Sequence, residues 1–255
     1  MKFKKSWQQG FSLVEMAIVL VILGFVLGAL LLPLRAQREQ AAQVQTTNTL
    51  ENAKHNLLGY VQQQGRLPCP ATAASSGIAS PNASGACTSQ LGYLPATTLG
   101  MQPTDVNGFA LDAWNNPIMY AVAQSKSGAA VTPFTANSAT DGMNIVGLVN
   151  LAPELRVCAS STGITAAACS GAAPETNYLI NNAVVVIYSL GSTGALASGG
   201  ADENSNPTAP ATPKKVFISH DVTAAGAPNG EFDHLVTWIS PYVLYNAMIQ
   251  AGQLH

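Results

Sequence analysis

A single carboxylate interrupts the most apolar stretch of the chain. Glu15 is the one ionisable side chain in residues 11–34, and a charge in a lipid-facing helix costs several kcal/mol unless it has a partner or lies near the interface. Cleavage between Gly10 and Phe11 would create a partner, because it frees an α-amino group that is positively charged at neutral pH. That amine would lie about one helical turn from Glu15 of its own chain, or could pair with Glu15 of a neighbouring chain and set the register of packed helices. The alternative is a signal anchor whose glutamate lies among the headgroups by chance.

The residues around Glu15 have the order of a membrane-targeting segment. Residues 1–10 contain three lysines and no acid, and a positive region before an apolar run is typical of Sec-type targeting with the N-terminus in the cytoplasm. A helix over 11–34 would be ~36 Å long, which exceeds a hydrocarbon core of ~30 Å. The run ends at Pro33 and Arg35 without a small-residue cleavage site. We therefore expect a single-pass membrane protein and not an ordinary secretory signal.

Together these N-terminal residues resemble the class III signal of type IV prepilins and type II secretion pseudopilins. The shared features are the short basic leader, Gly10 before the cut, Phe11 after it and Glu15 in the apolar run. The resemblance implies cleavage after Gly10 and N-methylation of Phe11 by an inner-membrane prepilin peptidase, with Glu15 as the assembly glutamate. Gly24 and Pro33 resemble the family's mid-helix glycine and helix-kinking proline, although Pro33 comes later than at the commonest spacing.

Small residues mark one face of the apolar segment. Gly24 and Gly28 form a G-x-x-x-G pattern, and Ala17 precedes it on the same face. Such a face lets two helices approach closely. Glycine is also common in membrane helices without that role, so helix packing and chance both remain open here.

The helical pattern continues beyond the apolar run and then stops. Apolar residues recur at spacings of three, four and seven up to about Gln64, which predicts an amphipathic second half of the same helix. Gly65, Pro68 and Pro70 cannot continue it. The apolar positions of this amphipathic half are Leu50, Ala53, Leu57, Leu58 and Val61. The predicted organisation is a cleaved leader over 1–10, a transmembrane half over 11–34, an amphipathic half over 35–64 and a globular head over 65–255 that lies outside the cytoplasm.

The head shows several short strand signals. Residues 183–188 are apolar on both faces and predict a central strand within 178–190. Further strands are predicted at 118–123, 143–149 and 216–219, and 235–251 is predicted to be a helix or an extended amphipathic segment broken by Pro241. With the resemblance, this predicts an α+β, pilin-like fold: a long N-terminal helix packed on a globular domain with an antiparallel sheet and long loops closed by disulfides.

Two further segments resemble parts of the same family. Residues 111–120 are similar to the D-P-W-G-N-P-x-x-Y segment of major secretion pseudopilins, with Ala113 and Asn115 in place of its proline and glycine. In that family the segment leads into the first strand of the sheet, and we expect Trp114 to bury a large surface beside the turn. Residues 65–70 and 232–240 resemble segments of larger prepilin-like proteins, which favours a minor subunit.

Four cysteines allow three pairings. Outside the cytoplasm disulfides are favoured over free thiols, and we favour the sequence-local pairs Cys69 with Cys87 and Cys158 with Cys169, each worth roughly 3 kcal/mol in the chain-entropy model. A zinc site is the competing interpretation. It has little support in the sequence, which contains no C-x-x-C and no histidines at ligand spacing.

One acidic stretch could hold a cation. Asp202, Asn204 and Asn206 place oxygen atoms at alternate positions, as a calcium-binding loop does, and Asp221, Glu231 and Asp233 could contribute from a second loop. The stretch lacks the glycine and the distant glutamate of an EF-hand, because prolines stand at those places. A solvated acidic loop is therefore the favoured interpretation, and calcium is the alternative.

Composition and motifs argue against an enzyme or a nucleic-acid-binding protein. The chain contains no G-x-S-x-G, H-E-x-x-H or G-x-x-x-x-G-K-[ST] motif. Loss of the leader leaves 8 basic against 13 acidic residues, a balance that does not favour binding to phosphate backbones. We expect a structural subunit of a type IV pilus or type II secretion filament. Its expected partners are other subunits, prepilin peptidase, an inner-membrane assembly platform and, before assembly, membrane lipid. The alternatives are a filament-tip adhesin and a membrane-tethered periplasmic protein that does not polymerise.

Overall fold

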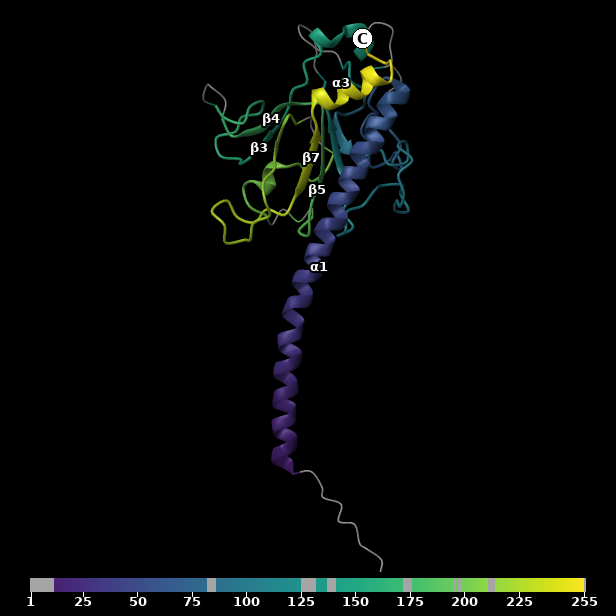
Figure 1. Cartoon of the computed structure of the whole chain (residues 1–255). Helices are drawn as coiled ribbons and strands as arrows, with labels where there is room; N and C mark the ends of the chain where they lie inside the picture. Colours follow the sequence, from purple (N-terminus) through teal and green to yellow (C-terminus); the bar gives the residue numbers. More distant parts are fainter. Residues whose placement is uncertain are drawn as a thin grey trace, which may run out of the picture. The chain divides into compact units, whose positions relative to one another are not determined.

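The computed structural model describes residues 12–81, 86–124, 132–136, 141–171, 176–194, 196, 199–210 and 214–254, without the side chains of 29–35. Its elements in chain order (Figure 1) are α1 (Leu13–Gln64), β1 (Leu91–Tyr93), β2 (Met119–Val122), α2 (Met143–Val146), the 3-10 turn η1 (Leu148–Asn150), β3 (Leu155–Cys158), β4 (Tyr178–Ala183), β5 (Val185–Ser189), the 3-10 turn η2 (Glu203–Ser205), β6 (Val216–Ile218), β7 (Leu235–Ile239) and α3 (Pro241–Gln250). The chain divides into two compact units, residues 1–42 and 43–255.

The first unit contains the N-terminal part of α1. All described side chains from Ser12 to Leu27 are exposed, and most of them are apolar. No helix among the described residues is both long enough and apolar enough to cross a membrane. The transmembrane boundaries 11–34 therefore stay a prediction, and Phe11 and the side chains of 29–34 lie outside the described residues.

The second unit contains the C-terminal part of α1, which buries one stripe of side chains. The helix ends at Gln64, as the pattern predicts, and Gly65 follows it with φ +66°, a backbone conformation that glycine adopts without a steric penalty. Leu58, on the edge of the stripe, is half-buried against the core. The buried stripe comprises Thr46, Leu50, Ala53, Leu57 and Val61. The apolar members of this stripe belong to the same core as the central strands of the head.

A four-stranded antiparallel sheet forms the centre of the head, in the order β1-β2-β5-β7 (Figure 1). Every residue of β2 and of β5 is buried. β5 lies between β2 and β7, with Val186 opposite Ala121 on one side and Trp238 on the other. The expectation of a central strand at 183–188 is confirmed in β5, and the strands expected at 118–123 and 216–219 are confirmed as β2 and β6.

A second sheet has the order β4-β3-β6 and includes a parallel pair, β3 with β6. The strand signal over 178–190 is therefore divided between two sheets. Residues Tyr178–Ala183 form β4 in the second sheet, and the chain passes to the central sheet at Val184. The polar residues of β4 fit this position, because β4 is largely exposed or half-buried whereas β5 is buried throughout.

Two other expected elements differ from the structure. Residues 143–149 form α2 and η1 and not a strand, because a short apolar run has no periodicity that separates strand from helix and Gly147 between them adopts φ +76°. The segment 235–251 consists of the strand β7 and the helix α3, so the expected break at Pro241 is confirmed and the single helix or extended segment is not. Pro241 does not interrupt a helix. It stands in the first turn of α3, where its missing N–H costs nothing, and Ser240 caps that helix by accepting a hydrogen bond from the Val243 N–H.

The pseudopilin-like segment leads into β2, which is the second strand of the sheet along the chain and not the first. Trp114 is only half-buried. The buried residue that organises this turn is Asp112, whose Oδ1 accepts from the backbone N–H groups of Trp114 and Asn116 and whose Oδ2 accepts from the Ser189 hydroxyl at 2.6 Å. This carboxylate ties the turn to the end of β5.

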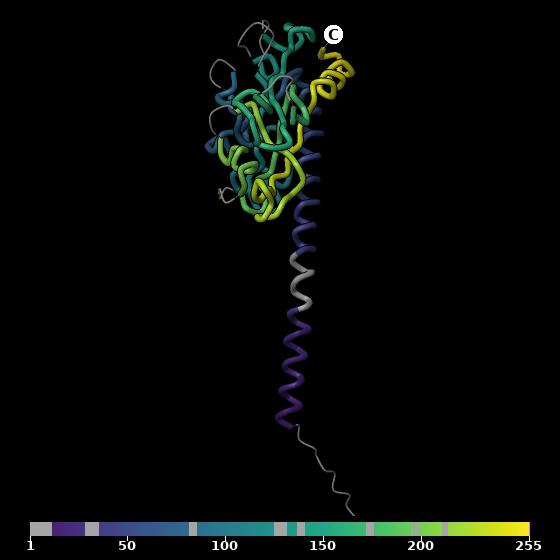
Figure 2. The backbone as a smooth tube through the Cα atoms, turned by 90° about the vertical axis from the view of Figure 1, so that its left-hand side faces the viewer, coloured from purple at the N-terminus to yellow at the C-terminus, as the bar shows by residue number. Residues whose placement is uncertain are grey.

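The two disulfides join the sequence-local cysteine pairs. Cys69 bonds to Cys87 and Cys158 bonds to Cys169. The first closes the segment that follows α1, and the second closes the loop that follows β3. Figure 2 shows the same backbone as a tube turned by 90° from the view of Figure 1, with several long loops in the head.

Candidate functional site

The first turn of α1 holds the residues that the N-terminal motif singles out. Ser12 precedes the helix, and its Oγ accepts a hydrogen bond of 3.1 Å from the Glu15 backbone N–H. Ser12 and Glu15 thus have the S-x-x-E spacing of a capping box, and an acidic residue in a first turn is stabilised by the helix dipole. Sequence reasoning treated the motif as a targeting signal and missed this local role. Gly10 and Phe11 lie outside the described residues.

The glycines expected at a helix interface both lie within α1. A Cβ built at Gly24 or at Gly28 would meet no described atom within 4 Å, so this face of α1 is open where it is described. Pro33 also lies within α1, but its side chain is outside the described residues. The interface role of these three residues stays a prediction.

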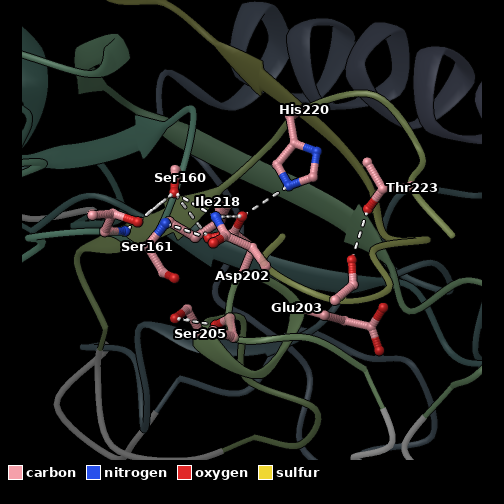
Figure 3. Close-up of polar contacts among 12 residues, drawn as sticks. Ser160, Ser161, Asp202, Glu203, Ser205, Ile218, His220 and Thr223 are labelled. Carbon is pink, nitrogen blue, oxygen red and sulfur yellow. Dashed lines mark hydrogen bonds and ion pairs between the residues drawn. The ribbon is translucent and has the colours of Figure 1, made fainter. Parts of the chain in front are cut away.

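In the head, the Asp202 side chain is buried and forms hydrogen bonds to other loops (Figure 3). Its Oδ1 accepts from the Ser161 N–H and the Ser160 hydroxyl, and its Oδ2 accepts from Asn229 Nδ2 at 2.8 Å and lies 3.2 Å from His220 Nε2. Burial alone would raise the pKa of this carboxyl, but the hydrogen bonds from Ser161, Asn229 and Ser160 outweigh burial and hold the pKa below its ordinary value. Asp202 therefore acts as an ionised acceptor that joins the disulfide loop to the 3-10 turn.

The other expected calcium ligands have separate partners. Asn204 donates to the Gly199 carbonyl, whereas Asn206 pairs with the backbone of Ile218 through both its amide nitrogen and its carbonyl oxygen. A 3-10 turn advances about 120° per residue, so alternate residues on η2 point in different directions. The side chains of Asp202, Asn204 and Asn206 have separate partners. Calcium binding by these three residues stays a prediction.

A different set of ionisable side chains does come together. Glu203, Asp233 and His234 are buried, and one ligand-type atom of each lies within 4.8 Å of the others. We call these residues the buried Glu-Asp-His group. In Figure 3 the Glu203 side chain points away from the contacts of its neighbour Asp202, a difference that the adjacent positions of the two acids in the sequence do not predict. The available signal was the adjacent pair Asp233-His234, which only the fold brings to Glu203.

Thr193 links the two carboxylates of this group. Its hydroxyl lies 3.0 Å from Glu203 Oε1 and 3.1 Å from Asp233 Oδ1. Asp233 Oδ2 accepts from the Ser192 hydroxyl and the Thr193 N–H, and Glu203 Oε2 accepts from the Asp233 N–H. Burial raises the pKa of Glu203, and the charge of Asp233 raises it further. The hydrogen bond from the Asp233 N–H lowers the pKa but does not outweigh these two effects.

His234 is the third member and is held in its neutral form. Burial lowers its pKa to about 4, although the charge of Asp233 acts in the opposite direction. Its Nδ1 lies 3.3 Å from Asn206 Nδ2. Its Nε2 is buried and has no hydrogen-bond partner in the described part of the chain.

Comparison with known families bears on the N-terminal segment. Residues 8–31 match the family model described as the prokaryotic N-terminal methylation motif. The chain carries a prepilin-type class III signal. Comparisons with curated proteins and with solved structures found no match.

The prepilin-type signal indicates in general terms how the precursor is processed and what it contacts. Its matched residues include Gly10, Phe11 and Glu15. A signal of this type implies contact with a prepilin peptidase and with other pilin-type subunits in general terms, and it is typical of structural and not catalytic proteins. The signal also fits a membrane-anchored precursor.

Proposed function

We propose that this chain is a minor pilin or pseudopilin, a structural subunit of a type IV pilus or of a type II secretion filament. The observation that carries the proposal is the methylation motif over residues 8–31. In this proposal prepilin peptidase cuts between Gly10 and Phe11, and the mature chain leaves the inner membrane for a periplasmic or cell-surface filament. The head, whose loops are closed by two disulfides, suits an oxidising compartment.

Glu15 has the central role in assembly under this proposal. It lies in the first turn of α1 among exposed apolar side chains. The freed amine of Phe11 in one subunit pairs with Glu15 of the next, which compensates the carboxylate in an apolar environment and fixes the axial register. Gly24 and Gly28 then let neighbouring helices approach closely.

The processing step is tested by the mass and sequence of the mature N-terminus. The chain is expressed with its prepilin peptidase, and we expect an N-methylated Phe11 as the first residue. A Gly10→Val variant should keep Met1 because the proposed cut follows a glycine, whereas Gln9→Ala should be processed as the parent is. An intact Met1 in the parent would refute the proposal.

The assembly step is tested with Glu15→Gln, which removes the charge and keeps the shape. We expect normal processing but at least a tenfold lower yield in the sheared filament fraction. Glu51→Gln is the matched control on the same helix, because Glu51 makes a surface ion pair with Lys54, and such pairs contribute little. Equal assembly of Glu15→Gln and the parent would remove the charge-pairing role.

A further inference from the structure

We propose that Glu203, Asp233 and His234 form a binding site for one divalent transition-metal ion of the zinc class. The proposal concerns the head and is independent of how the N-terminus is processed. The three ligand-type atoms lie within 4.8 Å of one another in a buried position. They come from η2 and from the segment that enters β7, so that an ion would join two loops distant in the sequence.

The hydrogen bonds of the group leave acceptor capacity that a cation can use. The Thr193 hydroxyl has one proton but faces both Glu203 Oε1 and Asp233 Oδ1, so it donates to only one of these oxygens at a time. The other oxygen keeps free lone pairs in a buried position. Two adjacent buried carboxylates also repel each other, and an ion of charge +2 would remove that repulsion.

His234 supplies the independent observation. The residue is 1% exposed, and its Nε2 has no hydrogen-bond partner within the described residues. A buried polar atom of this kind has lost its hydrogen bonds to water and gained none from the protein. Metal coordination through Nε2 satisfies the atom and uses the neutral imidazole that burial favours here.

The backbone around the group leaves room for its carboxylates. A Cβ at Gly199 would overlap the Glu203 carboxylate, and a Cβ at Gly191 would overlap that of Asp233. Ser192 and the Thr193 N–H hold Asp233 Oδ2, which orients the Oδ1 atom. Contacts of this kind behind the ligands fix the orientation of metal-binding groups.

The ligand types select zinc over calcium. Calcium takes six to eight oxygen atoms, whereas zinc is bound by imidazole nitrogen and carboxylate oxygen in sets of three or four. Zinc with ligands at ~2.1 Å holds ligand atoms ~3.4 Å apart, so the ion would shorten the separations between the three ligand atoms, now within 4.8 Å, by up to about 1.4 Å. At present the Asn206 amide nitrogen donates toward Nδ1 at 3.3 Å. Coordination through Nε2 places the ring proton on Nδ1, so two donors would face each other and the Asn206 side chain would have to move away.

The test uses the full chain in detergent after removal of metals with EDTA. Zinc is added, and bound metal and the melting temperature are measured. We expect the parent to bind one equivalent of zinc per chain and its melting temperature to rise. Glu203→Gln should lower the affinity for zinc at least tenfold and reduce the rise in melting temperature. Glu231→Gln, a nearby acid outside the group, should bind zinc as the parent does. If the folded parent takes up no zinc, or Glu203→Gln binds as tightly as the parent, the proposal is wrong.

A second measurement avoids the risk that a variant misfolds. X-ray absorption of the zinc-loaded parent should show outer-shell scattering from one imidazole and first-shell atoms at ~2.0–2.1 Å. A spectrum with oxygen ligands alone, or uptake of calcium without zinc, would overturn the role of His234. N-terminal processing is scored separately by mass spectrometry, so failure here leaves the filament proposal standing.

Discussion

At the scale of single residues, neighbouring acids in this head perform different tasks. Asp202 and Glu203 are adjacent, yet Asp202 has its pKa lowered by hydrogen bonds from Ser161, Asn229 and Ser160 that outweigh burial, while Glu203 has its pKa raised by burial and by Asp233. The first is therefore an ionised acceptor that holds loops together. The second is a carboxyl that gains from a proton or a cation.

The protonation of His234 should appear in the stability of the head as a function of pH. Below its ordinary pKa of ~6.5 the unfolded chain takes up a proton, but the folded chain does so only near a pKa of about 4. The stability present above pH ~6.5 should therefore be lost as the pH falls toward ~4, at up to about 1.4 kcal/mol per pH unit. The raised pKa of Glu203 acts in the opposite direction.

The measurement is chemical denaturation at several pH values in EDTA, for the parent and for His234→Gln. The variant should lack the His234 contribution, so the difference between the two curves isolates it from that of Glu203. Parallel curves from pH 7 to 4 would show that His234 has an ordinary pKa in the folded chain.

At the scale of elements, caps and turns decide where each segment begins and where its side chains point. Ser12 caps α1 and Ser240 caps α3, and Pro241 lies in the first turn of α3, where the expected break separates this helix from β7. The 3-10 turn η2 sends Asp202 and Glu203 to different partners. Ser240 before Pro241 is a helix start that residue types do indicate, whereas the directions of the side chains around η2 depend on backbone geometry that residue types alone do not specify.

The buried stripe of α1 gives a prediction for this scale. Leu57 is fully buried in the head core, whereas its neighbour Leu58 is only partly buried. Leu57→Ala should lower the free energy of unfolding by about 2–5 kcal/mol through lost burial and a cavity. Leu58→Ala, the same change one position along, should cost clearly less. The measurement is chemical denaturation of the 43–255 chain and of its two variants. Equal losses in the free energy of unfolding for both variants would mean that the buried stripe is wrongly assigned.

At the scale of the whole molecule, the chain has one unit with a core and one without. Within the described part of the chain, every buried residue lies at Thr46 or later. Residues 43–255 contain both disulfides and both sheets. The first unit instead carries exposed apolar side chains, which suit a segment that is to be covered by lipid or by other subunits.

A truncation to residues 43–255 should therefore fold alone. We expect a soluble chain with both disulfides and one cooperative thermal transition within a few degrees of that of the full chain in detergent. A cut at residue 65 is the control, because it also removes Leu50, Leu57 and Val61 from the core. Loss of cooperativity in the 43–255 chain would show that the N-terminal segment is needed for folding.

The sequence by itself determined the prepilin-type signal, the end of α1 at Gln64, the buried stripe and the central strand β5. These features depend on the local order of charges and on the spacing of apolar residues, and both can be recognised within a short segment of the sequence. The tertiary structure alone decided that 178–183 and 185–189 belong to different sheets and that 143–149 is helical. It also brought Glu203 to Asp233 and His234, because residues 30 positions apart meet only when the loops between them have folded around a common core.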